Sequence, residues 1–405
     1  MRGVRSLVAG LLGIAAAFLG ACDGPAPTPP QEATRAAPPP PLSPPAPRPS
    51  NRPLPSTPEA DPLDEADAVA ASLVERGLAY LAEHQNPDGS FGGEESRNVR
   101  LAVSSIATLA FLADGNSEHR GRYHRETSRG VKFLLDCAQR EGPDRGVFRA
   151  DGDTGSRMHG QGFATLALSQ AHGMFGVGRR FARSSTEVRD ILSEAVALIL
   201  ASQSRAGGWG YHPRRTEEDE GSMTVCMIQA LRGARNAGIA VAPGPVQDAL
   251  EYIRRSQKED GSIRYSLHGD LRSSFELTAA GATTLTAGGD NFSPALASAR
   301  DYLWERRFDE FLSGSGSLSS FPYYGLFYAV QALHFDYDDV RARRLARCYP
   351  AIVSWFRAHF DADTGVYVHT EHPRHMEMEY GDVYRTAFAT LTLQIRTGFL
   401  PIFQR

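Results

Sequence analysis

The sequence predicts an all-α fold in which six helix hairpins close into a double-walled ring of about twelve helices. Three observations predict it: a unit of about 55 residues that occurs six times, a turn shared by the units, and a second helix built largely from small residues. A recurring unit of this length is typical of proteins that stack one supersecondary element on the next. The landmark residues of the six copies are Tyr80, Phe133, Leu198, Tyr252, Tyr302 and Trp355, which lie 53, 65, 54, 50 and 53 residues apart.

The first half of each unit is an amphipathic helix pattern followed by a turn. Its charged face, rich in Arg and Glu, indicates an outer layer. In four copies the pattern runs to a glutamine: Gln85, Gln139, Gln203 and Gln257. A turn rich in Gly and Asp comes next, as in Gly207-Gly208, because glycine accepts the left-handed conformation that ends helices. An aromatic residue usually follows the turn.

The second half of each unit is a helix rich in Gly and Ala. Such small residues allow helices to crowd around a common axis, so we expect these six segments to form the inner layer. They are residues 102–113, 160–171, 222–234, 274–287, 323–333 and 383–395.

Composition excludes several classes of protein. The 405 residues are 41% apolar and 22% charged, with a formal net charge of -4, as is usual for a soluble globular protein. A nucleic-acid partner is not expected, because a nucleic-acid binder would show a basic excess. We predict neither a cofactor nor a metal ion.

The N-terminus has the features of a secretory signal. Arg2 and Arg5 precede an apolar stretch, residues 7–19, that is too short to span a membrane. The sequence Leu-Gly-Ala-Cys at 19–22 resembles a bacterial lipobox, which implies that Cys22 becomes the lipidated N-terminus. The expected organisation is a lipoprotein signal peptide at 1–21, the lipidated cysteine with a proline-rich disordered tether at 22–63, and the repeat domain at 64–405. This arrangement predicts a membrane-anchored lipoprotein of the bacterial cell envelope that faces the periplasm or the exterior.

Helix, glutamine, glycine-rich turn and aromatic together resemble the repeat of the squalene cyclase and protein prenyltransferase superfamily. The segments 323–332 and 400–405 resemble a bacterial branch known as prenyltransferase/squalene-oxidase repeat proteins. The resemblance covers residues 64–405 and implies an (α/α)6 toroid of six outer–inner hairpins. It does not imply a particular activity.

Two site patterns of that superfamily are incomplete here. Its cyclases protonate alkenes with an Asp-x-Asp-Asp motif at the start of an inner helix. Asp336-Tyr337-Asp338-Asp339 matches the letters but follows an inner helix, so we expect an exposed turn and helix cap on the opposite rim. Prenyltransferases require an Asp two residues before a zinc-binding cysteine, and Thr224 stands two residues before Cys226.

Other candidate metal and disulfide chemistry is weak. His369, His372 and His375 form a loose cluster whose spacing does not guarantee one helix face. With Cys22 assigned to the anchor, three cysteines remain, so a fully paired disulfide framework is excluded. We expect buried thiols at Cys137, Cys226 and Cys348.

The long loops from outer to inner helices predict the functional face. Long loops on one rim of a repeat ring usually bind ligands, and six helix N-termini lie there as well. The inner aromatic residues either line an open bore or fill it. The ligand-binding candidates are His159, Trp209, Tyr211, Glu220, His268, Glu276, Tyr323, Tyr324, Tyr328, Asp382 and Tyr384. For Trp209 we favour the alternative role of locking its turn.

Several functions remain open. A binding or scaffold protein would use the rim or bore to hold an apolar small molecule, a peptide or a glycan. A cyclase-like or prenyltransferase-like enzyme would act on an apolar isoprenoid-type substrate. A carbohydrate-processing enzyme would need a carboxylate pair, for which Glu220 and Glu276 are candidates. No catalytic residue is assigned by the sequence.

Overall fold

The computed structural model describes residues 62–175, 185–313, 321–336, 341–368 and 380–404. They form six helix hairpins, as the repeat predicts. The pairs are α1 (Pro62–Glu83) with α2 (Arg100–Ala113), α3 (His124–Asp136) with α4 (Arg157–Phe175), α5 (Ser185–Ser202) with α6 (Gly221–Asn236), α7 (Pro243–Ser256) with α8 (Phe275–Gly288), α9 (Pro294–Asp301) with α11 (Pro322–His334), and α12 (Arg341–Ala358) with α13 (Gly381–Leu393). In the fifth pair, the outer helix continues through a π-helical turn at Tyr302–Arg307 into α10 (Phe308–Leu312).

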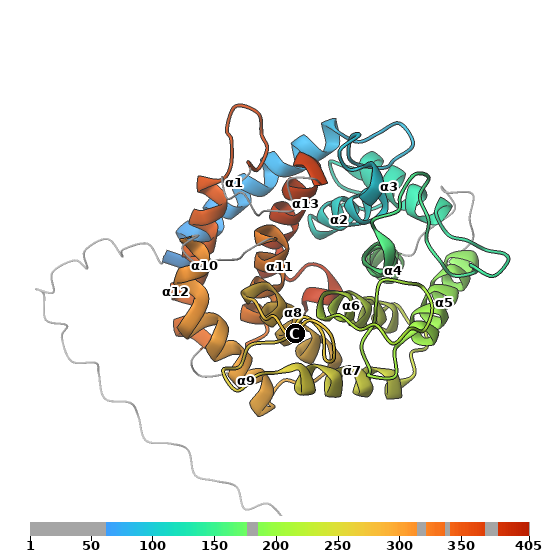
Figure 1. The fold of residues 1–405 in the computed structure, drawn as a ribbon. Coiled ribbons are helices and arrows are strands. Elements are labelled where there is room, and N and C mark those ends of the chain that lie inside the picture. Colours follow the sequence, from blue (N-terminus) through green and yellow to red (C-terminus); the bar gives the residue numbers. More distant parts are fainter. Residues whose placement is uncertain (1–61, 176–184, 314–320, 337–340, 369–379, 405) are drawn as a thin grey trace, which may run out of the picture. The chain divides into compact units, whose positions relative to one another are not determined.

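The inner helices form a closed ring. Helices α2, α4, α6, α8, α11 and α13 each pack on the next, and α13 packs on α2 to complete the circle. The outer helices surround them, and α1 also packs on α12, so the first and last units meet (Figure 1). The chain therefore folds as the predicted (α/α)6 toroid. Among the described residues, no helix combines the length and the apolar character that crossing a membrane requires.

The glutamine at the end of an outer helix connects neighbouring units. The Gln203 amide donates to the carbonyl of Gly207 at 2.7 Å, four residues on, and to that of Pro245 at 2.8 Å at the start of the next outer helix. Gln85 and Gln257 make the same two kinds of bond in their units. In these three units the glutamine thus fixes both the turn and the spacing between outer helices, whereas the Gln139 amide donates to the Cys137 backbone oxygen of its own unit.

The glycine that follows this glutamine is needed for two reasons. Gly207 has φ of +98°, in the left-handed region that favours glycine. A Cβ atom there would lie 2.3 Å from the backbone oxygen of Asp248, so only glycine allows the turn to approach the next helix.

Small residues allow the inner helices to approach closely. A Cβ atom on Gly162 of α4 would lie 2.9 Å from the Cβ of Cys226 on α6. The Gly- and Ala-rich pattern therefore reflects helix crowding around the axis, as predicted.

The C-terminal segment covers the end of the ring where the inner helices finish. Ile402 donates its backbone N–H to the Gln170 side chain at 3.0 Å, and Arg232 donates to the backbone oxygen of Gln404 at 3.2 Å. Ile402 and Phe403 are buried. The two rims of the toroid consequently differ. The outer-to-inner loops, most of them long, lie on one, the loop-rich rim, and the shorter inner-to-outer links and the chain end lie on the other, the short-link rim.

Candidate functional site

Three inner-helix starts on the loop-rich rim contribute to one polar cluster. His159 is the third residue of α4, Glu220 caps the N-terminus of α6, and Tyr324 lies in the first turn of α11. Two residues from the long loops, Tyr211 and Tyr265, complete it. We call these five residues, together with Ser222, the rim cluster.

Glu220 is the buried acid of the rim cluster, with 2% of its surface exposed. Its carboxylate accepts the backbone N–H groups of Ser222 and Met223, both at 3.0 Å, and the Ser222 hydroxyl. Burial raises the pKa of Glu220 to about 7, although these three hydrogen bonds act in the opposite direction. Near neutral pH the group therefore exists in both protonation states and is able to give or take a proton.

Ser222 connects Glu220 to His159. The Nε2 atom of His159 lies 3.1 Å from the Ser222 hydroxyl oxygen, which in turn bonds to Glu220. Burial, and secondarily the nearby Arg157 charge, lower the pKa of His159 to about 4. The imidazole is neutral at physiological pH, so Glu220 is the group in the chain Glu220–Ser222–His159 that gains or loses a proton near pH 7.

Arg157 and the tyrosines frame this chain. The backbone of Arg157 has φ of +47°, a conformation uncommon for a non-glycine residue, and its guanidinium lies 5.2 Å from the centre of the Tyr211 ring. The hydroxyls of Tyr211 and Tyr265 hydrogen-bond to each other. Strained backbone of this kind is often found at functional sites.

Aromatic rings pack along the axis below the rim cluster. Tyr324 contacts Tyr328 with ring centres 4.7 Å apart, and Phe388 contacts Tyr324, Tyr384 and Phe163. All of these residues are buried. The Tyr328 hydroxyl lies 3.4 Å from the Cys226 sulfur. At this level of the axis, the inner aromatic residues pack against one another.

Two of the predicted candidates, Trp209 and Tyr323, are structural by position. Trp209 is fully buried and its indole N–H donates to the Ile199 backbone oxygen at 2.7 Å, the geometry expected of the turn-locking role. Tyr323 is 1% exposed, and its hydroxyl donates to the Val368 backbone oxygen at 2.8 Å.

Three more candidates are not members of the rim cluster. His268 is exposed on the loop before α8. Asp382 is exposed and forms an ion pair with Arg385 on its own helix. Glu276 is buried, but its side chain packs against Gly325 of α11, where a Cβ atom would lie 2.5 Å from the Glu276 Cγ.

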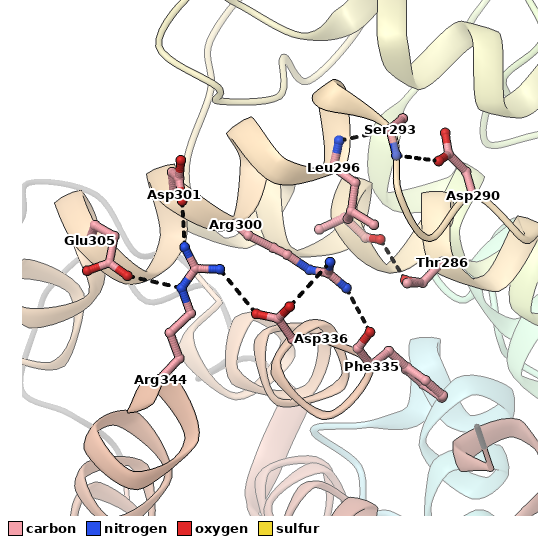
Figure 2. A network of polar contacts seen from close by, with 11 residues as sticks. Thr286, Asp290, Ser293, Leu296, Arg300, Asp301, Glu305, Phe335, Asp336 and Arg344 are labelled. Carbon is pink, nitrogen blue, oxygen red and sulfur yellow. Dashed lines mark hydrogen bonds and ion pairs between the residues drawn. The ribbon is translucent and has the colours of Figure 1, made fainter. Parts of the chain in front are cut away.

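The expectation of an exposed turn at Asp336 is wrong. Asp336 follows α11 on the short-link rim, as predicted, but it is fully buried. Figure 2 shows its carboxylate between Arg300, at 3.4 Å, and Arg344, at 3.1 Å. Sequence could not reveal this because the two arginines come from α9 and α12. Asp338 and Asp339 lie outside the described residues.

The remaining candidates are the possible metal ligands and the three cysteines. In the part of the chain that the structure describes, no group of three or more His, Cys, Asp or Glu residues could hold a metal ion. The cluster at His369, His372 and His375 lies outside that part. Cys137, Cys226 and Cys348 are buried free thiols, as predicted, and burial raises the pKa of each to about 12.

Sequence reasoning identified His159, Glu220, Tyr211 and Tyr324 but missed two members of the rim cluster. Ser222 falls within the small-residue pattern of an inner helix, and Tyr265 follows a repeat turn as an aromatic residue, so neither stands out in the sequence. The available signal for Ser222 is its place two residues after Glu220, where its hydroxyl reaches the capping carboxylate.

Comparisons with known proteins concern mainly the fold. No family model matches the sequence. A drimenyl diphosphate synthase from Streptomyces showdoensis is 27% identical over 193 residues, which are 48% of this chain and 32% of that protein. The chain thus spans about a third of the length of the curated relative that it matches.

Solved structures cover most of the chain at low identity. A variant of the type II terpene cyclase MstE from Scytonema, in complex with geranylgeranyl dihydroxybenzoate, is 14% identical, with a TM-score of 0.53 over 83% of this chain and 100% of that one. A mutant of Rex8A from Paenibacillus barcinonensis, in complex with an arabinofuranosyl-xylotetraose, is also 14% identical, with a TM-score of 0.53 over 83% of this chain and 94% of that one. The chain therefore has the α/α-toroid fold of type II terpene cyclases, which confirms its resemblance to the terpenoid cyclase/prenyltransferase-like superfamily at the level of fold.

Proposed function

We propose that this toroid is an enzyme in which Glu220 acts as a general acid on an apolar, isoprenoid-type substrate bound at the loop-rich rim. The observation that carries the proposal is the hydrogen-bonded chain that runs from the buried Glu220 through the half-buried Ser222 to the half-buried His159. It places a carboxyl group with a pKa of about 7 at the start of an inner helix, beside aromatic side chains.

The proton path follows from the hydrogen bonds. Protonated Glu220 gives its proton to the substrate and becomes a carboxylate. The N–H groups of Ser222 and Met223 at the start of α6 then stabilise that negative charge, as helix N-termini do. His159, which remains neutral, orients the Ser222 hydroxyl.

The acidity of Glu220 favours an oxygen atom as the proton acceptor. A carboxyl group with a pKa of about 7 is a weak acid, and an alkene carbon is a far poorer base than an epoxide, hydroxyl or ether oxygen. We therefore infer an oxygenated isoprenoid rather than a plain alkene. Asp336, the first residue of the cyclase-like motif, is unsuited to the acid role, because its buried ion pairs hold it in the structural network of the opposite rim. This supports the choice of Glu220 as the acid.

The substrate class rests on the comparisons. The MstE complex contains a geranylgeranyl compound, and the curated relative is a terpenoid synthase by name. The aromatic residues Tyr324, Tyr328 and Phe388 make the surroundings of the rim cluster apolar, as a site for a polyprenyl chain requires.

The test compares two substrates and two variants. We expect turnover of a geranylgeranyl epoxide but not of the parent alkene. Glu220→Gln should lower kcat by about 10²–10⁴-fold, the usual contribution of a general acid. Glu94→Gln, at an exposed acid, is the control and should leave kcat unchanged. The rate should fall as the pH rises through about 7, because the acid form of Glu220 is consumed.

Two results would contradict the proposal. Unchanged turnover in Glu220→Gln would remove the assigned acid. Cleavage of xylo-oligosaccharides in place of the epoxide would favour glycoside hydrolysis, the activity suggested by the carbohydrate complex of the Rex8A mutant.

A binding or scaffold protein is the second candidate. The close packing of Tyr324, Tyr328 and Phe388 favours it, because side chains occupy the axis at that level. This function predicts capture of the geranylgeranyl compound without turnover, and a dissociation constant that does not change in Glu220→Gln.

We further propose that a lipid on Cys22 anchors the protein to the bacterial cell envelope. The lipobox-like residues 19–22 support the proposal and lie outside the described part of the chain. Cys22→Ser should move the protein from the membrane fraction to the soluble fraction. Unchanged membrane association of the variant would contradict lipidation at this residue.

A further inference from the structure

A pocket lies on the short-link rim, where the first and last units meet. Its volume is about 460 Å³. One wall is a face of α1, and the others include the C-terminal ends of α2 and α13. The rim cluster lies at the N-terminal ends of inner helices, so this pocket is separate from the site proposed above.

The α1 wall has an apolar interior and an acidic edge. Ala70, Val74 and Leu78 follow one another at helical spacing and are buried. Asp67 and Glu75 belong to the same face. Leu393 of α13 adds apolar surface opposite α1. A ligand that fits these walls has an apolar body and a charged end.

The polar end of the pocket favours a cation. Asp114 and Gln394 are the C-terminal caps of α2 and α13, two neighbouring inner helices, and both line the pocket. Helix C-termini carry partial negative charge on their free carbonyl groups. Two such termini therefore add to the charge of the carboxylates.

The charges of the lining residues do not balance. Arg396 binds Asp67 through two hydrogen bonds, at 2.9 and 2.7 Å, and Arg122 pairs with Glu75 at 3.3 Å. Within the described residues, Asp114 has no ion pair and accepts a hydrogen bond from Asn116 at 2.9 Å. Partial burial raises the pKa of Asp114. A bound cation would restore the balance.

Three side-chain oxygen atoms of residues that line the pocket lack hydrogen-bond partners among the described residues, those of Gln394, Tyr123 and Tyr349. In the described part of the chain, neither the amide oxygen nor the amide nitrogen of Gln394 makes a hydrogen bond, and the same holds for the Tyr123 hydroxyl. Gln394 is 3% and Tyr123 is 8% exposed. Buried polar groups without partners are costly, and both residues line the pocket.

We propose that this pocket binds a small organic ammonium ion with an apolar body. The ammonium group carries three N–H donors, and Asp114, the Gln394 amide oxygen and the Tyr123 hydroxyl are acceptors for them. The apolar body packs against Ala70, Val74 and Leu393. The proposal does not depend on the function assigned to the opposite rim.

The experiment titrates the full chain with two molecules of the same shape. The probe is 2-phenylethylammonium, and 2-phenylethanol replaces its charge with a hydroxyl. Binding is followed by saturation-transfer NMR and calorimetry. We expect the alcohol to bind about tenfold more weakly, and we expect added salt to weaken only the ammonium. Equal affinities, or no ammonium binding at millimolar concentration, would overturn the proposal.

Three variants locate the bound ion. Asp114→Asn should weaken ammonium binding about tenfold, since it removes a charge while keeping the shape. Asp136→Asn, at the C-terminal end of α3 and outside the pocket, is the matched control and should bind as the wild type does. Full affinity in Asp114→Asn would show that the pocket is not the binding site.

The third variant separates a ligand role from a structural one. Gln394→Leu should weaken ammonium binding about threefold while leaving Tm unchanged or higher, because the amide makes no hydrogen bond among the described residues. A lower Tm with unchanged binding would assign Gln394 a structural role and contradict the proposal. Glu220→Gln should not affect ammonium binding, which keeps this test independent of the enzyme proposal.

Discussion

Glu220 and Asp336 are both buried carboxylates at ends of inner helices, and they lie on opposite rims of the toroid. Within the described residues, Glu220 has uncharged donors, Ser222 and Met223. Asp336 lies between the guanidinium groups of Arg300 and Arg344. Burial is similar, at 2% and 0% exposed, so the neighbours make the difference. A buried acid is available for proton transfer only where no fixed cation neutralises it.

The polar groups on the two rims have different roles in the ring. On the short-link rim, Arg344 binds Asp301, Glu305 and Asp336, so one side chain ties α12 to α9, to the π-helical turn and to the end of α11 (Figure 2). On the loop-rich rim, Glu220, Ser222 and His159 form a hydrogen-bonded chain that a proton can follow. The Asp336 network thus connects helices, whereas the chain at Glu220 is the one to which the proposed function assigns proton transfer.

The largest expected effect is at Asp336. Asp336→Ala should lower the free energy of unfolding by about 3–5 kcal/mol, because it leaves the Arg300 and Arg344 charges buried without their shared partner. Urea denaturation measures this. Asp301→Asn, at a half-exposed partner of Arg344, is the control and should cost less than about 1 kcal/mol. A loss below about 1 kcal/mol in Asp336→Ala would show that the network does not hold the rim.

A loss of comparable size is expected at Trp209 on the loop-rich rim. Trp209→Ala should lower the free energy of unfolding by about 3–5 kcal/mol, because the indole is fully buried and hydrogen-bonded to Ile199. Tyr211→Phe, two residues away, removes only a hydroxyl and should cost about 1 kcal/mol or less. Near-normal melting of Trp209→Ala with weakened ligand capture would instead assign Trp209 to binding.

The pH dependence of stability tests the shifted pKa values of Glu220 and His159 on the loop-rich rim. The folded protein holds a proton on Glu220 up to about pH 7, whereas the unfolded chain releases it near 4.5, so this group lowers stability as the pH rises from 4.5 to 7. The pKa of His159 falls from 6.5 to about 4 on folding, so this group raises stability as the pH rises from 4 to 6.5. The two contributions oppose each other, and each is on the order of 3 kcal/mol.

Single variants uncover each contribution. In Glu220→Gln the free energy of unfolding should rise between pH 4 and 6.5, because only His159 still contributes to its pH dependence. In His159→Gln the free energy of unfolding should fall between pH 4.5 and 7, because only Glu220 still contributes. Chemical denaturation at half-unit pH intervals measures both curves. If both variants followed the wild-type curve, the rim cluster would not contain the shifted groups.

The smallest effect is expected at Asp338, the third letter of the acid motif. From its position in the sequence, after an inner helix, Asp338→Asn should change stability by less than about 0.5 kcal/mol and leave turnover unchanged. A selective loss of turnover with stability preserved would return the motif to catalysis and reverse the roles of the two rims.

The repeat pattern alone was sufficient to predict the ring of six helix hairpins. Six copies of a local unit specify six hairpins, since helix periodicity, the turn glycines and the glutamine act within one unit or between neighbours. Gln203 illustrates this: its partners are Gly207, four residues away, and Pro245 at the start of the next outer helix. The turn-locking role favoured for Trp209 also agrees with its geometry, because the indole bonds to Ile199, only ten residues away.

Which polar residues contact one another depends on the tertiary fold and could not be predicted from the sequence. His159 and Ser222 are 63 residues apart, and Arg300 is 36 residues from Asp336, so no local pattern marks either contact. The pocket on the short-link rim forms because the last unit closes on the first and brings Gln394 near Asp114. Repeats report the spacing of helices along the chain. The surroundings of a buried acid depend partly on groups that the tertiary fold brings from other units, which is why the sequence did not reveal that Asp336 is buried between Arg300 and Arg344.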